Sequence, residues 1–181
     1  MIKLIAQIVN IFPGDGKHPY ARTGELGFWH LKKVGATGVI LGHSEVNEPP
    51  EIVNKKLIAA FNEGLEDNVV LLGESWEELG KSWAQCSNSE KEKVKRLVKE
   101  RFLKILENIN KNIVRFTIFG YEPGWAVRGS GKENVPSPGV EQITASADLL
   151  RETISELYTE EIAQKIKIIY GGSSSPRKPK K

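Results

Sequence analysis

Short runs of apolar residues alternate with longer amphipathic stretches along most of the chain. Within a run the apolar residues are consecutive rather than alternate, which is typical of strands buried on both faces of a parallel sheet. We therefore expect five strands, at residues 3–12, 38–42, 68–73, 113–120 and 166–170.

The stretches between these runs have the periodicity of amphipathic helices. In residues 50–64, Val53, Leu57 and Phe61 lie on one face, and Gly64 fits a C-terminal cap. A capping hydroxyl followed by proline predicts that another helix begins at Ser137-Pro138. Further helices are expected within residues 23–34, ended by Gly35, and over residues 89–110.

This alternation predicts parallel strands joined by right-handed crossovers. An open doubly wound sheet and a (β/α)8 barrel both fit the pattern. The chain supplies about five strand–helix units, whereas a complete barrel needs eight. No linker-like segment divides the chain, so we expect one α/β domain over residues 1–176 and a basic C-terminal tail at residues 177–181.

Composition narrows the possible classes of function. Hydrophobic residues make up 39% and charged residues 27% of the sequence, which is the balance of a globular protein. No stretch approaches the ~18 to 20 apolar residues of a membrane span. The short apolar start is broken by Gln7 and Asn10, which favours a strand over a signal peptide. We expect a cytoplasmic protein with no membrane partner.

Charge and cysteine content exclude further classes. The formal net charge is +3, and part of it lies in the tail, so the body lacks the basic face that a nucleic-acid partner would need. Cys86 is the single cysteine, which excludes an internal disulfide and a cysteine-cluster metal site.

Polar and glycine-rich segments follow the strands at their carboxyl ends, where parallel α/β folds carry reactive groups. Alone, a histidine, a glutamate or a Gly-Gly pair at such a position is more often structural. Together they offer a polarising group, a base and a phosphate cradle on one rim. The segments are His43-Ser44-Glu45, Glu74, Tyr121-Glu122-Pro123 and Gly171-Gly172-Ser173.

In their order and rough spacing, these segments resemble the triosephosphate isomerase family. Residues 40–45 (ILGHSE) resemble its histidine motif, and residues 168–173 (IIYGGS) its seventh-strand phosphate loop. Residues 121–127 (YEPGWAV), with 129–132 (GSGK), resemble its catalytic glutamate and mobile lid. Smaller matches are 23–25 (TGE), at the tip of its third loop, and 72–74 (LGE), at the end of its fifth strand.

The resemblance implies a partial (β/α)8 TIM barrel and the interconversion of dihydroxyacetone phosphate and glyceraldehyde 3-phosphate through an enediolate, a glycolytic and gluconeogenic reaction. By the same resemblance, Glu122 would be the base and neutral His43 the electrophile. Ser44 and Glu45 would hold the rim in place around them. The substrate would be a small phosphorylated sugar, and no metal or organic cofactor is implied.

The resemblance also assigns the phosphate site and the lid. Backbone N–H groups of Gly129, Gly172 and Ser173, with the Ser173 hydroxyl, would hold the phosphate. Residues 123–132 would be the lid, with Pro123, Trp125 and Lys132 among its residues and Trp125 anchoring a hinge. Thr23, Gly24 and Glu25 would contact the second subunit of a homodimer, whereas Trp76 and Trp83 are expected to be packing residues.

The chain also departs from the family pattern. It begins at what resembles the third strand, and it contains no candidate for the lysine of the family's first strand, which balances the substrate's phosphate charge. The eighth strand, with its Gly-Gly pair, is also absent. Gly124 and Val46 stand where the family commonly has valine and arginine. From these departures we expect little or no isomerase activity from this chain alone.

Two alternatives remain open at this point. The pair of Glu122 and His43 would serve any α-hydroxycarbonyl, so the chain could isomerise another phosphorylated ketose. It could also be a non-catalytic fragment that binds a phosphorylated ligand or associates with other chains.

Overall fold

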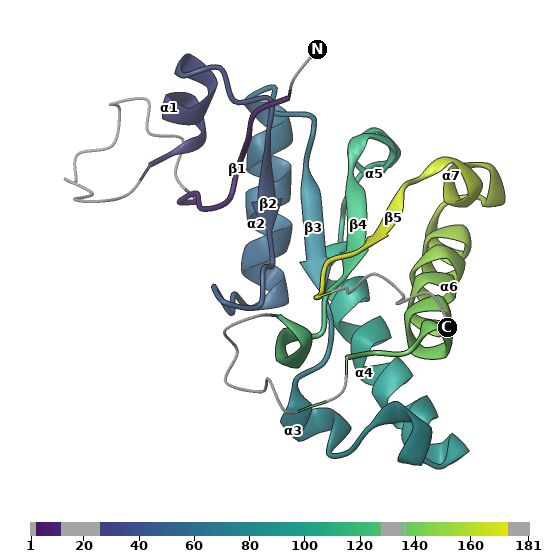
Figure 1. Ribbon diagram of the computed structural model, residues 1–181. Helices are drawn as coiled ribbons and strands as arrows, with labels where there is room; N and C mark the ends of the chain where they lie inside the picture. Colours follow the sequence, from purple (N-terminus) through teal and green to yellow (C-terminus); the bar gives the residue numbers. More distant parts are fainter. Residues whose placement is uncertain (1–2, 12–25, 128–134, 136, 174–181) are drawn as a thin grey trace, which may run out of the picture.

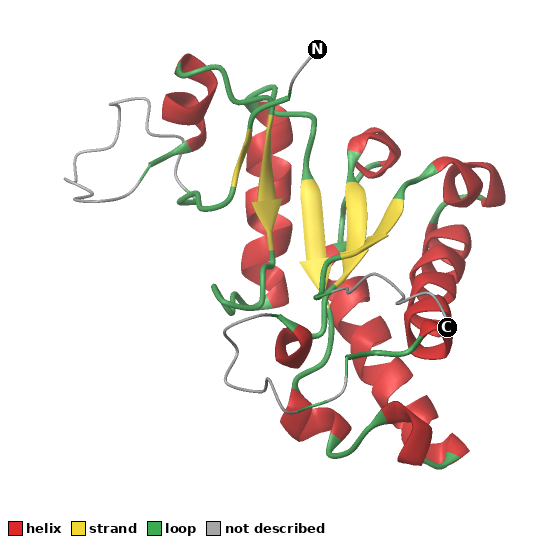
Figure 2. Ribbon diagram, in the orientation of Figure 1, coloured by secondary structure: helices red, strands yellow, loops and turns green. Residues whose placement is uncertain are grey.

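The five apolar runs form one parallel sheet in the order β1–β2–β3–β4–β5. The computed structural model describes residues 3–11, 26–127, 135 and 137–173. Figure 2 shows the strands side by side. The partial-barrel α/β fold is therefore confirmed in its strand number, direction and alternation with helices. The strands are β1 (Ile5–Ala6), β2 (Gly38–Leu41), β3 (Val69–Leu72), β4 (Ile118–Tyr121) and β5 (Ile168–Tyr170).

Helices connect these strands in the order shown in Figure 1. Three of them, α2 (Pro50–Asn62), α4 (Asn88–Ile105) and α6 (Val140–Leu157), carry most of the helical core. The shorter helices are α1 (Phe28–Lys33), α3 (Trp76–Leu79), α5 (Lys111–Phe116) and α7 (Glu160–Lys165), with 3-10 turns η1 (Trp83–Gln85) and η2 (Gly124–Ala126). None of the helices described is both long and apolar enough to cross a bilayer.

The main core lies on one face of the sheet. Val39, Val70 and Phe119 are fully buried there, together with Leu57 of α2 and Phe102 of α4. The Phe102 ring meets the Phe119 ring edge to face, with 5.1 Å between centroids. The opposite face of the sheet contributes none of its side chains to this core, so the helices and the sheet form two layers.

Two predicted strands are wrong in extent. The run at residues 113–120 begins as helix α5, because the Asn110 side chain accepts hydrogen bonds from the N–H groups of Asn112 and Ile113 and so caps a helix there. The run at residues 3–12 forms only β1, since Val9 turns into the core and the Asn10 N–H donates to the Leu26 carbonyl. Hydrophobic periodicity reveals neither the helix cap at Asn110 nor the turn of the chain after β1.

The helix boundaries show smaller differences. Helix α6 begins at Val140 with Gly139 as its N-cap, rather than at Ser137-Pro138. Helix α3 was not expected, although Ser75 and Glu78 form a capping box that is readable in the sequence. Helix α7, capped by Thr159, was also not expected. The tail at residues 177–181 lies outside the described residues.

Candidate active site

His43 and Glu122 meet at the carboxyl-terminal rim of the sheet. Glu122 directly follows β4, and His43 follows β2 by two residues. Because the strands are parallel, these ends share one edge of the sheet. His43 Nε2 lies 3.7 Å from Glu122 Oε2, across the end of β3. The structure thus brings together the two side chains to which the family resemblance gives the chemistry.

Glu122 is held in a nearly dry position. Its side chain is 2% exposed, and its Oε1 accepts a hydrogen bond from the Ser44 N–H at 3.0 Å. Its own backbone N–H donates to the Leu72 carbonyl at 2.8 Å. One oxygen of the carboxylate is therefore bound by the loop that follows β2, and the other faces the imidazole of His43.

His43 is oriented by the turn that follows it. Its backbone carbonyl accepts hydrogen bonds from the N–H groups of Val46 and Asn47, which closes the turn. Its Nδ1 accepts the Glu45 N–H at 3.2 Å. A neutral imidazole that accepts at Nδ1 carries its proton on Nε2, so the nitrogen facing Glu122 is a donor. Ser44 and Glu45 thus act on the pair through their backbone N–H groups.

Because Gly171 has no side chain, the side chain of Glu122 can pack directly against its backbone. The Gly171 N–H donates to the Tyr121 carbonyl at 2.9 Å, which places the end of β5 against Glu122. A Cβ atom at residue 171 would lie 3.0 Å from Glu122 Oε2 and 3.1 Å from Glu122 Cβ. A side chain at residue 171 would therefore require Glu122 to shift by a few tenths of an ångström.

Gly171→Ala is expected to displace the Glu122 carboxylate and to lower any Glu122-dependent proton transfer by about tenfold or more, since misplacing a reacting group is costly. Gly139→Ala is the matched control, because a Cβ at residue 139 meets nothing within 4 Å. Deuterium exchange into dihydroxyacetone phosphate measures the effect. Equal rates for the two variants would contradict the spacing argument.

The expected phosphate loop lies beside this pair but is partly occupied by internal contacts. The Ser173 N–H donates to the Ala126 carbonyl at 2.9 Å, so it becomes available to a phosphate only when Ala126 moves. A Cβ at Gly172 would meet the Tyr170 hydroxyl, so a larger residue there would require the Tyr170 side chain to move. Gly129 lies outside the described residues.

A buried polar cluster lies behind Glu122. Glu74 Oε1 accepts hydrogen bonds from the Tyr121 hydroxyl at 2.8 Å and from Gln142 Nε2 at 3.0 Å, and Gln142 Nε2 also donates to the Tyr121 oxygen at 2.9 Å. All three residues are at most 2% exposed. Burial raises the pKa of Glu74, against the hydrogen bonds from Tyr121 and Trp125. The cluster ties α6 to the ends of β3 and β4.

Glu74→Gln is expected to flatten part of the pH dependence of stability. Because the folded-state pKa of Glu74 is raised, the folded protein binds more protons than the unfolded chain above pH 4.5. The free energy of unfolding of the wild type should therefore fall relative to Glu74→Gln as pH rises from 4.5 through the raised value. Urea unfolding over a pH series tests this, with the exposed Glu66→Gln as control.

The start of the predicted lid is packed against aromatic residues. Trp125, 5% exposed, meets Trp76 edge to face with 5.4 Å between ring centroids, and it shares a small core with Trp83. Pro123 precedes the 3-10 turn η2 that carries Trp125. Lys132 lies outside the described residues, as do Thr23, Gly24 and Glu25.

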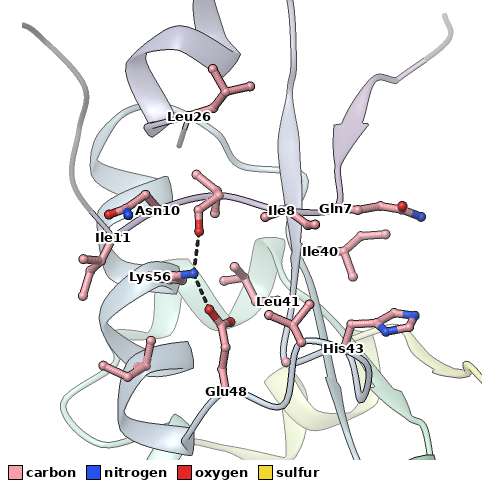
Figure 3. Close-up of a pocket in the computed structure, with 14 residues that line it drawn as sticks. Gln7, Ile8, Asn10, Ile11, Leu26, Ile40, Leu41, His43, Glu48 and Lys56 are labelled. Atoms are coloured by element: carbon pink, nitrogen blue, oxygen red, sulfur yellow. Dashed lines mark hydrogen bonds and ion pairs between the residues drawn. The ribbon is translucent and has the colours of Figure 1, made fainter. Parts of the chain in front are cut away.

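Two cavities adjoin the pair. His43 lines a cavity of about 640 Å³ with Gln7 and Leu26, beside the Lys56 ammonium, which binds the Val9 carbonyl and the Glu48 carboxylate (Figure 3). Glu122 lines a second cavity of about 440 Å³. Gly42 borders both cavities, so the imidazole and the carboxylate line two neighbouring hollows.

Gln142 was not among the residues that the sequence pattern singled out. It lies in helix α6, far from any strand end in sequence, and only the packing of that helix brings its amide to Tyr121. Glu74 and Tyr121 were visible as residues at strand ends, but their mutual contact was not.

Comparisons with known proteins agree with the residue pattern. The family model described as triosephosphate isomerase matches residues 2–181. The chain is 37% identical over 161 residues to triosephosphate isomerase of Dictyoglomus thermophilum, covering 87% of this chain and 58% of that protein. It is 34% identical over 160 residues to triosephosphate isomerase of Caldanaerobacter subterraneus subsp. tengcongensis, covering 86% and 58%.

A more distant relative is matched over more of the chain. The chain is 29% identical over 177 residues to triosephosphate isomerase of Mycoplasma genitalium, covering 94% of this chain and 64% of that protein. The chain thus spans less than two thirds of the length of these relatives.

Proposed function

We propose, from the premise that this chain belongs to the triosephosphate isomerase family, that it carries the proton-transfer pair for interconverting dihydroxyacetone phosphate and glyceraldehyde 3-phosphate. The observation that supports this best is the approach of His43 Nε2 to Glu122 Oε2 at 3.7 Å. A carbonyl oxygen next to the imidazole would place the adjacent C–H within reach of the carboxylate.

Glu122 is the proposed base. Its carboxylate takes the C1 proton of dihydroxyacetone phosphate, the C–H electrons form the C1–C2 double bond, and the carbonyl electrons move to the C2 oxygen. The proton of the C1 hydroxyl then moves to the C2 oxygen, the O1 electrons form the C1 carbonyl, and the carboxyl group of Glu122 returns its proton to C2, which yields the aldehyde. The side chain's 2% exposure favours this role, since burial keeps competing water away from the carboxylate oxygens.

His43 is the proposed electrophile. With Nδ1 accepting the Glu45 N–H, the proton on Nε2 is available to the C2 oxygen. This donor stabilises the negative charge as it develops on the enediolate oxygen. The substrate's own carbonyl accepts the electrons, so the step needs no organic cofactor.

We further propose that the phosphate binds at Gly172 and Ser173, with Gly129 and the lid around Lys132 closing over it, as the family resemblance implies. Thr23, Gly24 and Glu25 would contact a second subunit in a cytoplasmic homodimer. The physiological context would be glycolysis and gluconeogenesis.

The proposal is tested by incubating the chain with dihydroxyacetone phosphate in D2O and following the C1 proton by NMR. The chain should accelerate loss of this signal over buffer, and His43→Gln should remove most of the acceleration. A rate equal to that of buffer would reject the proposed function.

Steady-state turnover should nevertheless be low. His43 is 25% exposed, and the described cations nearest the site are already paired, Lys56 with Glu48 and Arg101 with Glu78. We expect a coupled assay to give a kcat/KM about three orders of magnitude or more below that of the Dictyoglomus thermophilum relative, since missing charge stabilisation acts directly on the barrier. Comparable values for the two proteins would refute this.

A further inference from the structure

The side chain of Arg101 reaches from helix α4 to the rim of the sheet. Arg101 precedes Phe102, whose ring packs on Phe119 with 5.1 Å between centroids, so this turn of the helix is fixed against the sheet. Arg101 Nη1 donates to the Gly73 carbonyl at 2.8 Å, one residue beyond the end of β3. Arg101 and Glu122 also line the same cavity of about 440 Å³. A cationic side chain of α4 therefore holds the backbone at the end of β3, close to the proposed base.

The backbone of Gly73 packs directly on the backbone of Glu122. A Cβ atom at residue 73 would lie 2.6 Å from the Glu122 carbonyl carbon. The carbonyls on either side of Gly73 hold the same segment. That of Leu72 accepts the Glu122 N–H at 2.8 Å, and that of Glu74 accepts the Gly124 N–H at 3.3 Å. A shift of the Gly73 peptide would therefore move the backbone from which the Glu122 side chain projects.

Glu78 holds the guanidinium of Arg101 in this orientation. Its carboxylate accepts Arg101 Nη1 at 2.9 Å, Arg101 Nη2 at 2.5 Å and the Ser75 N–H at 2.8 Å. Burial acts to raise the pKa of Glu78, but the hydrogen bonds from Arg101 and Ser75 outweigh it and lower that pKa from its usual 4.5, so the carboxylate stays charged at neutral pH. The two-pronged contact needs a planar guanidinium, which lysine does not have. Together these contacts immobilise the turn at residues 73–75.

We propose that Arg101 is a positioning residue for Glu122 and acts through the Gly73 carbonyl. The guanidinium donates to Gly73 and Glu78, so its effect on the Glu122 carboxylate passes through the backbone. The inference rests on the proposed function, in which Glu122 takes a proton from carbon. Because proton transfer is sensitive to small displacements of the base, the contact should affect the reaction rate more than substrate binding.

The Ser44 N–H separates this role from a merely structural one. A contact that only joined α4 to the turn after β3 would change the free energy of unfolding and leave the geometry of the folded site as it is. The Ser44 N–H donates to Glu122 Oε1 at 3.0 Å, and it belongs to the loop after β2, not to the turn that Arg101 holds. The NMR resonance of this amide proton depends on the length of the hydrogen bond and so reports where the Glu122 carboxylate lies.

The test compares Arg101→Met with the wild type, since methionine keeps the helix propensity of arginine but donates no hydrogen bond. Arg101→Met should lower the rate of deuterium exchange at saturating dihydroxyacetone phosphate about tenfold or more, with little change in the half-saturating concentration. Its Ser44 amide proton resonance should move toward the position found in Glu122→Ala, which lacks the acceptor. Arg101→Lys, which keeps the charge, should give intermediate values. Arg96→Met, at an exposed site of the same helix, should match the wild type.

The other outcomes count against the inference. A folded Arg101→Met protein with the wild-type Ser44 resonance and exchange rate would overturn it, even if that protein unfolded at a lower urea concentration. If Arg101→Met does not fold, Arg101→Lys decides the matter, and an unmoved Ser44 resonance in that variant would overturn the inference. The proposed function fails by a different result, a wild type that exchanges no faster than buffer. The Ser44 resonance then still shows whether Arg101 sets the position of the carboxylate.

Discussion

Glu122→Gln lowers the rate of deuterium exchange into dihydroxyacetone phosphate by about a hundredfold or more, if the carboxylate is the general base. The amide has nearly the same shape, and its oxygen can still accept the Ser44 N–H that now binds Glu122 Oε1 at 3.0 Å. It cannot take a proton from carbon. Comparing the wild type with Glu122→Gln by NMR in D2O therefore tests the basicity of the side chain while its shape stays nearly the same.

The control for this variant is a measurement of its stability. The free energy of unfolding of Glu122→Gln should stay close to that of the wild type, because the hydrogen bond from Ser44 and the buried position are retained. A stable Glu122→Gln protein that exchanges deuterium as fast as wild type would show that another group removes the proton.

Phe102→Ala is expected to lower the free energy of unfolding by about 3–5 kcal/mol, the usual cost of emptying a fully buried phenylalanine site. Phe102 is 0% exposed and packs on Phe119, three residues before Glu122. Urea unfolding monitored by circular dichroism measures the change.

The matched variant lies on the other face of the sheet. Ile169→Ala should cost about 1 kcal/mol or less in the isolated chain, since a half-exposed side chain loses little burial. Ile169 is 43% exposed. If both substitutions were equally destabilising, the other face would already be part of the core, and the layer arrangement described above would be wrong.

The rim of the site could be predicted from sequence because of one property of parallel sheets. Consecutive apolar residues predicted the strands. Polar residues that directly follow parallel strands lie at the same edge of the sheet. This reasoning placed His43 and Glu122 on one rim, although 79 positions in sequence order separate them. Their actual spacing depends on the Ser44 and Glu45 backbone N–H groups, which no side-chain pattern reveals.

The remaining features depended on tertiary contacts. Ile113 and Val114 are β-branched, which favours a strand, but the Asn110 cap and burial of both side chains make them helical. Gln142 resembles any polar residue in the first turn of a helix until α6 packs against Tyr121. Nor does a run of apolar residues say which of its two faces is covered, and here only one face joins the main core.

The most direct measurement is the NMR spectrum of the histidine rings during titration with 2-phosphoglycolate, a phosphorylated carboxylate shaped like the enediolate. The chain has three histidines, and His43→Gln identifies the relevant signals. We predict that the His43 resonances shift on binding, that the His30 resonances do not, and that Gly171→Ala weakens the binding. Binding that leaves His43 unperturbed would contradict the claim that His43 and Glu122 act on one phosphorylated substrate.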